Sequence, residues 1–121
     1  PIAIRQGGEL STSEILSVKH NFKPEFWHGP PPDVTRAYRP SLAYRMALVA
    51  EGKFDAMITF RPSWEWDVAA GDLILKEAGA ATSDRAGNPL RYNNPTPKVS
   101  GVLAAGTDLH GKIASRLTFT D

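Results

Sequence analysis

Asp67 is the acidic residue whose sequence surroundings point most directly to chemistry. It lies in the segment Trp64-Glu65-Trp66-Asp67-Val68-Ala69-Ala70-Gly71-Asp72. A helix that begins near Asp67 would hold this carboxylate in its first turn, where unpaired backbone amides and the helix dipole favour an anion. A carboxylate at the mouth of a buried helix suits a hard divalent cation such as Mg²⁺, which prefers oxygen ligands.

The same pattern has a simpler explanation, which is that Asp67 only caps its helix. Helix caps are far commoner in proteins than metal sites, and Asp is one of the preferred capping residues. On the residues alone, capping is therefore the preferred interpretation of Asp67, and metal binding is the alternative.

The helix expected over residues 67–78 is apolar around most of its circumference. The small or apolar side chains along it are Val68, Ala69, Ala70, Leu73, Ile74, Leu75 and Ala78. Asp72 and Lys76, four residues apart, mark a narrow face that we expect to meet solvent. A helix of this kind must be nearly enclosed by other elements, and we expect Trp66 to pack in the core beside it.

Other elements are expected to surround this helix. Short apolar runs predict buried strands over residues 16–18, 55–60 and 102–105. A helix is expected over residues 41–50, ended by Gly52, and Thr107 should cap a last helix that carries Leu109, Ile113 and Leu117. This alternation of helices and strands predicts an α/β fold with helices on the faces of a sheet.

Two further segments carry turn signals. Gly87-Asn88 lies between residues 81–83 and 90–92, which predicts a hairpin around a turn at residues 84–89. The run Gly29-Pro30-Pro31-Pro32 predicts that residues 27–33 form a surface loop or short linker.

Composition limits the class of protein. The 121 residues are enough for one domain, and 41% apolar and 22% charged residues are typical of a globular protein. The net charge of +1 gives no reason to expect nucleic acid as a partner. The sequence shows no cysteine and no apolar run of about 20 residues, and its first residues have no signal-peptide pattern, so we expect a cytoplasmic protein without a membrane partner. Because it begins with Pro, we expect a piece of a longer or processed polypeptide.

The segment from Trp66 to Ala80, WDVAAGDLILKEAGA, is followed by Thr82, Asp84, Gly87, Pro89 and Leu90. Together they resemble the second signature of the inositol monophosphatase superfamily, a W-D-x-A run, then E-A-G-G and a T-D-x-x-G hairpin. Residues 41–52 resemble the preceding helix of that family, and residues 102–106 resemble the strand before its last helix. The likeness spans roughly residues 17–117. The departures from the family pattern are Ser41, Ala80 and an inserted Ser83.

The resemblance implies a specific role for Asp67. In that family the Asp of the W-D pair is a ligand of a catalytic Mg²⁺ ion and lies near the substrate, which favours the metal-ligand interpretation over capping. The other ligands come from an N-terminal lobe, in an acidic E-E pair and a D-P-x-D-G-T motif that this sequence lacks. One carboxylate cannot assemble a centre of two or three metal ions. The resemblance thus implies that residues 1–121 are the C-terminal lobe of a Mg²⁺-dependent phosphomonoesterase, with a mixed sheet, inactive alone and partnered by its N-terminal lobe.

The resemblance also bears on the substrate. Inositol monophosphatases carry a Glu that binds inositol hydroxyls seven residues before the metal-binding Asp, and this chain has Phe60 there. Ala50-Glu51-Gly52, with a basic residue at Arg45, looks closer to the 3'(2'),5'-bisphosphate nucleotidases. Those enzymes hydrolyse adenosine 3',5'-bisphosphate, a by-product of sulfate assimilation. We therefore expect a nucleotide bisphosphate substrate, with inositol phosphate as the alternative.

Four residues join Asp67 as candidates for substrate binding. Arg45 resembles a basic residue that faces phosphate in the nucleotidases, although a solvated helix position is equally compatible with its type. Leu16-Ser17-Val18-Lys19-His20 resembles the A-S-R-S-H segment of their nucleotide pocket, which suggests Ser17 and His20. A hydrogen-bonded surface histidine is the commoner explanation for His20. Ser41, at the start of the helix before Arg45, is the fourth candidate.

A second class of function stays open. The chain could be a non-catalytic fragment, or a lobe used for binding or for forming a homodimer. The coding sequence upstream of Pro1 separates these hypotheses, because a D-P-x-D-G-T motif and an acidic pair there would indicate a complete enzyme.

Overall fold

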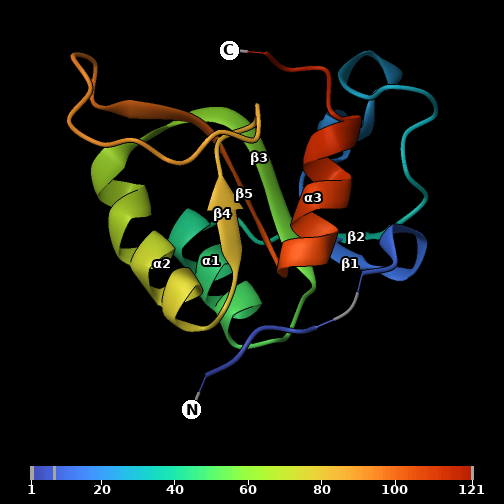
Figure 1. Ribbon diagram of the computed structural model, residues 1–121, viewed down its shortest axis with the longest axis horizontal. Helices are drawn as coiled ribbons and strands as arrows, with labels where there is room; N and C mark the ends of the chain where they lie inside the picture. The colour runs from blue at the N-terminus through green and yellow to red at the C-terminus, as the bar shows by residue number, and fades with distance from the viewer. Residues whose placement is uncertain (1, 7, 121) are drawn as a thin grey trace.

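A five-stranded mixed sheet with helices on both faces forms the framework of the computed structural model, which describes residues 2–6 and 8–120 (Figure 1). The strands are β1 (Glu14–Leu16), β2 (Thr35–Ala37), β3 (Ala56–Trp64), β4 (Ala81–Ser83) and β5 (Lys98–Ala105), in the order β2-β1-β3-β5-β4. β1 runs parallel to β2 and β3, and β5 runs antiparallel to β3 and β4. The predicted α/β fold with a mixed sheet is therefore confirmed.

Three α-helices cover this sheet, α1 (Leu42–Ala50), α2 (Glu65–Glu77) and α3 (Thr107–Arg116). In the described residues, three short 3₁₀ helices lie near the first strands: η1 (Leu10–Thr12) precedes β1, and η2 (Lys19–Phe22) and η3 (Pro24–Phe26) lie between β1 and β2. The helices expected over residues 41–50 and 67–78 are confirmed as α1 and α2. The strands expected over residues 55–60 and 102–105 are confirmed within β3 and β5, whereas β1 begins two residues before its expected position.

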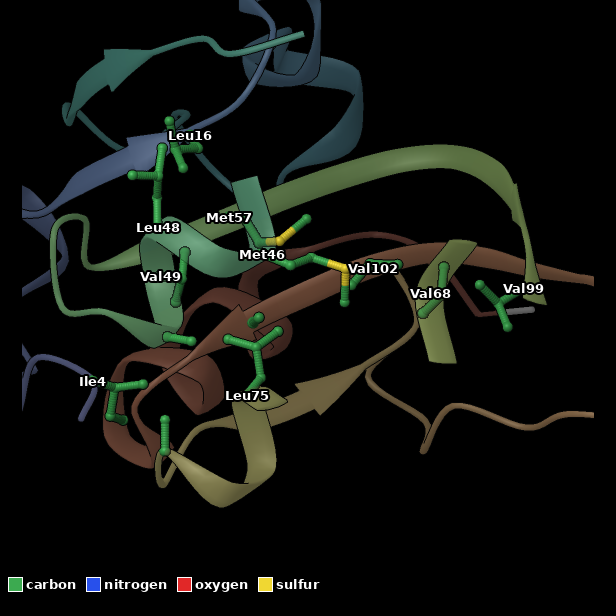
Figure 2. Close-up of a cluster of buried hydrophobic side chains, with 13 residues drawn as sticks. Ile4, Leu16, Met46, Leu48, Val49, Met57, Val68, Leu75, Val99 and Val102 are labelled. Carbon is green, nitrogen blue, oxygen red and sulfur yellow. The ribbon is translucent and has the colours of Figure 1, made fainter. Parts of the chain in front are cut away.

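The two faces of the sheet bury separate cores. One core lies beneath α1 and α2 and includes Leu16, Met57, Val68 and Leu75 (Figure 2). The other lies on the α3 face and includes Ile15, Ile58 and other side chains that alternate with the first set. Because successive side chains of a strand point to opposite faces, a continuous apolar run such as that of β3 is what two covered faces require.

The predicted hairpin between residues 81–83 and 90–92 is wrong. β4 pairs instead with β5, with Ala81 opposite Ala105 and Ser83 opposite Leu103. The turn itself forms, because the Asp84 carboxylate accepts backbone hydrogen bonds from Ala86 and Asn88 at 3.0 Å. The backbone groups of β4 form their hydrogen bonds with β5, so the residues after the turn do not pair with β4.

The prediction of a solvent-facing Asp72 and an enclosed helix is also wrong. Asp72 is 3% exposed and accepts hydrogen bonds from Thr82 Oγ1 at 2.6 Å and from the Tyr92 hydroxyl at 2.7 Å. The side of α2 that meets solvent carries Trp66, Leu73 and Ile74, which are 63%, 60% and 45% exposed. An apolar helix has no polar face to indicate its orientation, so the sheet and the loop after β4 decide which side is buried.

Two smaller expectations are corrected by local contacts. Trp27 does not belong to a surface loop, because it is buried and its Nε1 donates to the Asn21 carbonyl at 2.9 Å. Thr107 is the first residue of α3 rather than its cap, and the capping position belongs to Gly106.

A buried polar pair links β4 to α3. Ser83 is 2% exposed, and its hydroxyl donates to the Asp84 carbonyl at 2.8 Å. His110 Nε2 lies 2.7 Å from the same Ser83 oxygen, so in this arrangement Nε2 carries the proton and donates. Burial lowers the pKa of His110 below its usual value, because the charged imidazolium is poorly solvated there.

This pair predicts a pH dependence of stability. The folded chain binds fewer protons at His110 than the unfolded chain, so the free energy of unfolding should fall as the pH drops through about 6.5, the usual pKa of histidine. His110→Gln keeps a side-chain donor but does not titrate, and should show a smaller loss of stability between pH 7 and pH 5. Urea unfolding of both proteins at several pH values measures this difference. Parallel pH profiles would contradict the assignment.

Candidate functional site

A hollow of about 360 Å³ opens where β1 ends and β3 passes beside it. Its lining comes from distant parts of the chain, namely Val18, His20, Asn21, Phe26, Tyr38, Arg45, Thr59, Phe60, Arg61, Arg85 and Phe119. The carboxyl ends of parallel strands are a common place for ligands in α/β folds. The lining contains three arginines, one histidine and no carboxylate, so the chemistry of the hollow favours an anion.

A bulge in the sheet shapes one wall of this hollow. Thr59 pairs with Val102 and Pro62 with Ser100, so Phe60 and Arg61 lie opposite the single residue Gly101. Gly101 adopts φ +80°, and a Cβ at this position would lie 2.3 Å from the Thr59 carbonyl oxygen. A bulge bends its strand and redirects the side chains beside it. Here both bulged residues, Phe60 and Arg61, line the hollow.

Arg45 brings a half-buried positive charge to the hollow from α1. Its Nη1 donates to Thr59 Oγ1 at 3.2 Å, and its guanidinium carbon lies 5.4 Å from the centre of the Tyr38 ring. Among residues 2–6 and 8–120, no carboxylate forms an ion pair with Arg45. Burial lowers the pKa of Arg45, because no counter-ion compensates for the lost hydration of its charge. A bound anion would provide that compensation.

Aromatic rings form the wall beside the arginines. The Phe26 ring centre lies 5.3 Å from that of Phe60 and 5.6 Å from that of Phe119, and the last two are 4.8 Å apart. The guanidinium carbon of Arg85 lies 4.4 Å above the Phe119 ring. Aromatic faces next to guanidinium groups suit a ligand that combines a flat ring with a negative charge.

Of the four residues that the sequence suggested for substrate binding besides Asp67, two line the hollow and two lie outside it. Arg45 and His20 both line it. Ser17 does not, because it is fully buried and accepts a hydrogen bond from the Asn21 side chain at 3.0 Å. Ser41 caps α1 by accepting from the Tyr44 amide at 3.2 Å and also lies outside the lining. The sequence analysis did not predict Arg61, Arg85 and Phe119 as lining residues. The sequence signal for the bulge beside Arg61 is Gly101, a glycine within the apolar run of β5.

Asp67 lies outside the hollow, in the first turn of α2. The helix begins at Glu65, and in the part of the chain that the structure describes the Asp67 side chain makes no capping hydrogen bond. The same turn is held by Glu65, whose carboxylate accepts from the amides of Asn93 and Asn94 at 2.7 and 2.9 Å. Asp67 thus presents exposed carboxylate oxygens on a fixed turn, which fits one ligand of Mg²⁺. The described residues contain no group of three or more His, Cys, Asp or Glu side chains that could hold a metal ion.

Comparison with known proteins identifies the fold and the family. The structure of inositol monophosphatase-II from Staphylococcus aureus MSSA476 superposes with a TM-score of 0.75 at 21% identity, over 95% of this chain and 43% of that one. The fold is therefore that of one part of an inositol monophosphatase. Residues 8–120 match the inositol monophosphatase family, and the chain belongs to this family.

Curated relatives carry more than one activity in their names. Inositol-1-monophosphatase from Bacillus subtilis is 37% identical over 79 residues, which are 65% of this chain and 28% of that enzyme. The 3'-phosphoadenosine 5'-phosphate phosphatase from Mycobacterium tuberculosis is 32% identical over 83 residues, 60% of this chain and 31% of the enzyme. The chain therefore spans less than a third of either relative, and their likeness to it does not single out the nucleotidases. No helix in residues 2–6 and 8–120 is long and apolar enough to cross a membrane.

Proposed function

We propose that this chain is the substrate-binding C-terminal lobe of a Mg²⁺-dependent phosphomonoesterase that acts on a nucleotide such as adenosine 3',5'-bisphosphate. The observation that carries the proposal is Arg45, a half-buried guanidinium without a carboxylate partner in the described chain, in a hollow with aromatic walls and no acidic lining residue. Family membership supplies the reaction class, phosphate ester hydrolysis.

The lining favours a nucleotide over inositol phosphate. A polyol offers several hydroxyl donors, and a site specific for it needs acceptors that leave none of them unpaired. The lining carries Phe60 where the inositol-specific members have Glu, and its acceptors are few. Phe26, Phe60 and Phe119 instead provide apolar ring surface of the kind on which a base packs.

Mg²⁺ and the other half of the enzyme complete this proposal. Asp67 would contribute one oxygen ligand, and a bound Mg²⁺ ion would polarise the phosphate ester and stabilise the leaving oxygen. The remaining ligands and the groups that position the attacking water belong to an N-terminal lobe. Within this chain, Arg45 holds and orients the anion, and the aromatic wall excludes water from the nucleotide.

Removal of the Arg45 charge should weaken nucleotide binding by about tenfold, the effect of losing one charge-assisted contact. Titration calorimetry of the 121-residue chain with adenosine 3',5'-bisphosphate compares the parent with Arg45→Gln. Arg91→Gln makes the same change on an exposed loop outside the hollow and serves as the matched control. Equal losses in both variants would attribute the effect to net charge and contradict a site at Arg45.

Inositol phosphate remains the second candidate, because an inositol-1-monophosphatase is among the relatives at 37% identity. The same titration with inositol 1-phosphate separates the two. Tighter binding of inositol 1-phosphate than of the nucleotide would replace the proposed substrate, whereas failure of both to bind would favour a non-catalytic lobe.

A further inference from the structure

We infer that Glu65 is a positioning residue for Asp67, because its carboxylate fixes the first turn of α2 to the loop that joins β4 to β5. Glu65 touches neither substrate nor metal in this role and acts through the backbone of the turn that carries Asp67. The inference rests on the proposed function, since it takes Asp67 to be a ligand of Mg²⁺.

Both oxygens of the Glu65 carboxylate bind that loop. Oε1 accepts from the Asn93 amide at 2.7 Å, and Oε2 accepts from the Asn94 amide at 2.9 Å and from Asn94 Nδ2 at 2.8 Å. The Glu65 amide donates in turn to the Pro97 carbonyl at 2.9 Å. A single residue therefore ties the start of α2, through both its side chain and its backbone, to the loop that passes beside it in Figure 1.

The loop has a backbone conformation that suits this carboxylate. Asn93 has φ +64°, and no other non-glycine residue that the structure describes has a positive φ. Asn adopts this left-handed conformation more readily than most residues. A left-handed residue turns successive backbone amides toward one side, where they can bind an anion. Here the anion is Glu65, so the uncommon conformation of the loop and the position of Glu65 depend on each other.

Asp67 depends on this attachment because its own side chain is not held. In the described part of the chain it makes no hydrogen bond or ion pair, and Trp64 at the capping position makes no side-chain hydrogen bond to the helix. The first turn of a helix has amides without partners inside the helix and frays unless it is held. Loss of a group that orients a metal ligand typically costs about 10- to 100-fold in metal affinity. Glu65 holds the turn from which Asp67 extends.

A second attachment of the same loop to α2 provides an internal comparison. The Tyr92 hydroxyl donates to the Asp72 carboxylate at 2.7 Å, at a position in α2 more than one turn beyond Asp67. Tyr92→Phe removes this hydrogen bond and leaves the contacts of Glu65 in place. If both attachments only stabilise the loop, the two losses should have similar effects on the metal. If Glu65 positions Asp67, only its loss should change Mg²⁺ binding.

Mg²⁺ titration of the natural longer polypeptide that contains this chain tests the inference. Gln has the size of Glu, but in Glu65→Gln an NH₂ group faces a donor of the loop where the carboxylate offered an oxygen. Calorimetry without substrate should show Mg²⁺ binding weakened by about tenfold, and the Mg²⁺ concentration for half-maximal phosphate release should rise by a similar factor. Turnover at saturating Mg²⁺ should return to nearly that of the parent. Tyr92→Phe should keep the parent's Mg²⁺ affinity, although its melting temperature falls.

Asn94→Ala reaches the same contact from the loop side. It removes the Nδ2 donor alone and keeps the backbone amide, so it should weaken Mg²⁺ binding in the same direction as Glu65→Gln and by a smaller factor. If Glu65→Gln does not fold, this variant decides, and parent-like Mg²⁺ affinity in Asn94→Ala would then overturn the inference.

Parent-like Mg²⁺ affinity in a folded Glu65→Gln would overturn the inference directly. Equal losses of affinity in Glu65→Gln and Tyr92→Phe would overturn it as well, because they would assign both effects to a loosened loop. Phosphatase assays of the longer parent protein test the proposed function separately. A parent that binds Mg²⁺ more tightly than Glu65→Gln and Asp67→Asn, but hydrolyses neither substrate, would keep the role of Glu65 and refute the activity.

Discussion

Asp67→Asn should lower the turnover of the complete phosphatase by at least about 100-fold while leaving its melting temperature almost unchanged. Asn has nearly the same size as Asp and lacks the negative charge that would hold the metal ion and offset the developing charge of the reaction. Little stability should be lost, because Asp67 is exposed and in the described chain makes no hydrogen bond or ion pair. The assay measures Mg²⁺-dependent phosphate release from adenosine 3',5'-bisphosphate and inositol 1-phosphate, with thermal melting in parallel.

Asp84→Asn is the matched control, since it removes the same charge from a turn outside the first turn of α2. It should lower stability through the loss of a stronger acceptor for Ala86 and Asn88, with turnover close to that of the parent. Parent-like turnover of Asp67→Asn on both substrates would refute the metal-ligand role. Turnover that recovers at higher Mg²⁺ concentration would support it, because weaker metal binding is the expected defect.

Gly101→Ala should destabilise the chain by about 3 kcal/mol, which combines left-handed backbone strain with overpacking against the bulge. The residue has φ +80°, and the new Cβ would approach the Thr59 carbonyl oxygen to 2.3 Å and Phe60 Cα to 3.2 Å. Both neighbours are backbone atoms of β3, so neither can move aside without disturbing the central pair of strands. Urea unfolding followed by circular dichroism gives the free energy of unfolding directly.

Gly29→Ala separates the cost of the left-handed backbone conformation from the cost of overpacking. Gly29 has φ +76°, but a Cβ there would meet no atom within 4 Å. Its substitution should cost only about 1 kcal/mol, the price of the backbone conformation alone. Equal losses at both positions would show that the bulge tolerates a side chain.

A further consequence of Gly101→Ala is weaker nucleotide binding, because the bulge places Phe60 and Arg61 on the wall of the hollow.

Local pattern was sufficient for most of the secondary structure. Apolar runs of β-branched and small residues correspond to β3 and β5, and the helical spacing of Leu42, Met46 and Val49 corresponds to α1. These signals are local, because side-chain periodicity reflects which face of an element is buried. The prediction of a hairpin after β4 was wrong because strand pairing is not decided locally. Its pairing partner depended on a distant strand, β5, whose open edge competed with the nearer segment.

The α/β class, the family likeness and the place of Asp67 in the first turn of a helix could all be predicted from the sequence. The burial of Asp72 and the outward direction of Leu73 could not, since a helix that is apolar all round carries no polar stripe to orient it. The hollow is likewise a tertiary feature. Its walls join His20, Arg45 and Phe119, which lie on separate elements and share no local pattern. Chemistry that depends on such distant residues is set by packing, because spacing along the chain says nothing about which of them meet in space.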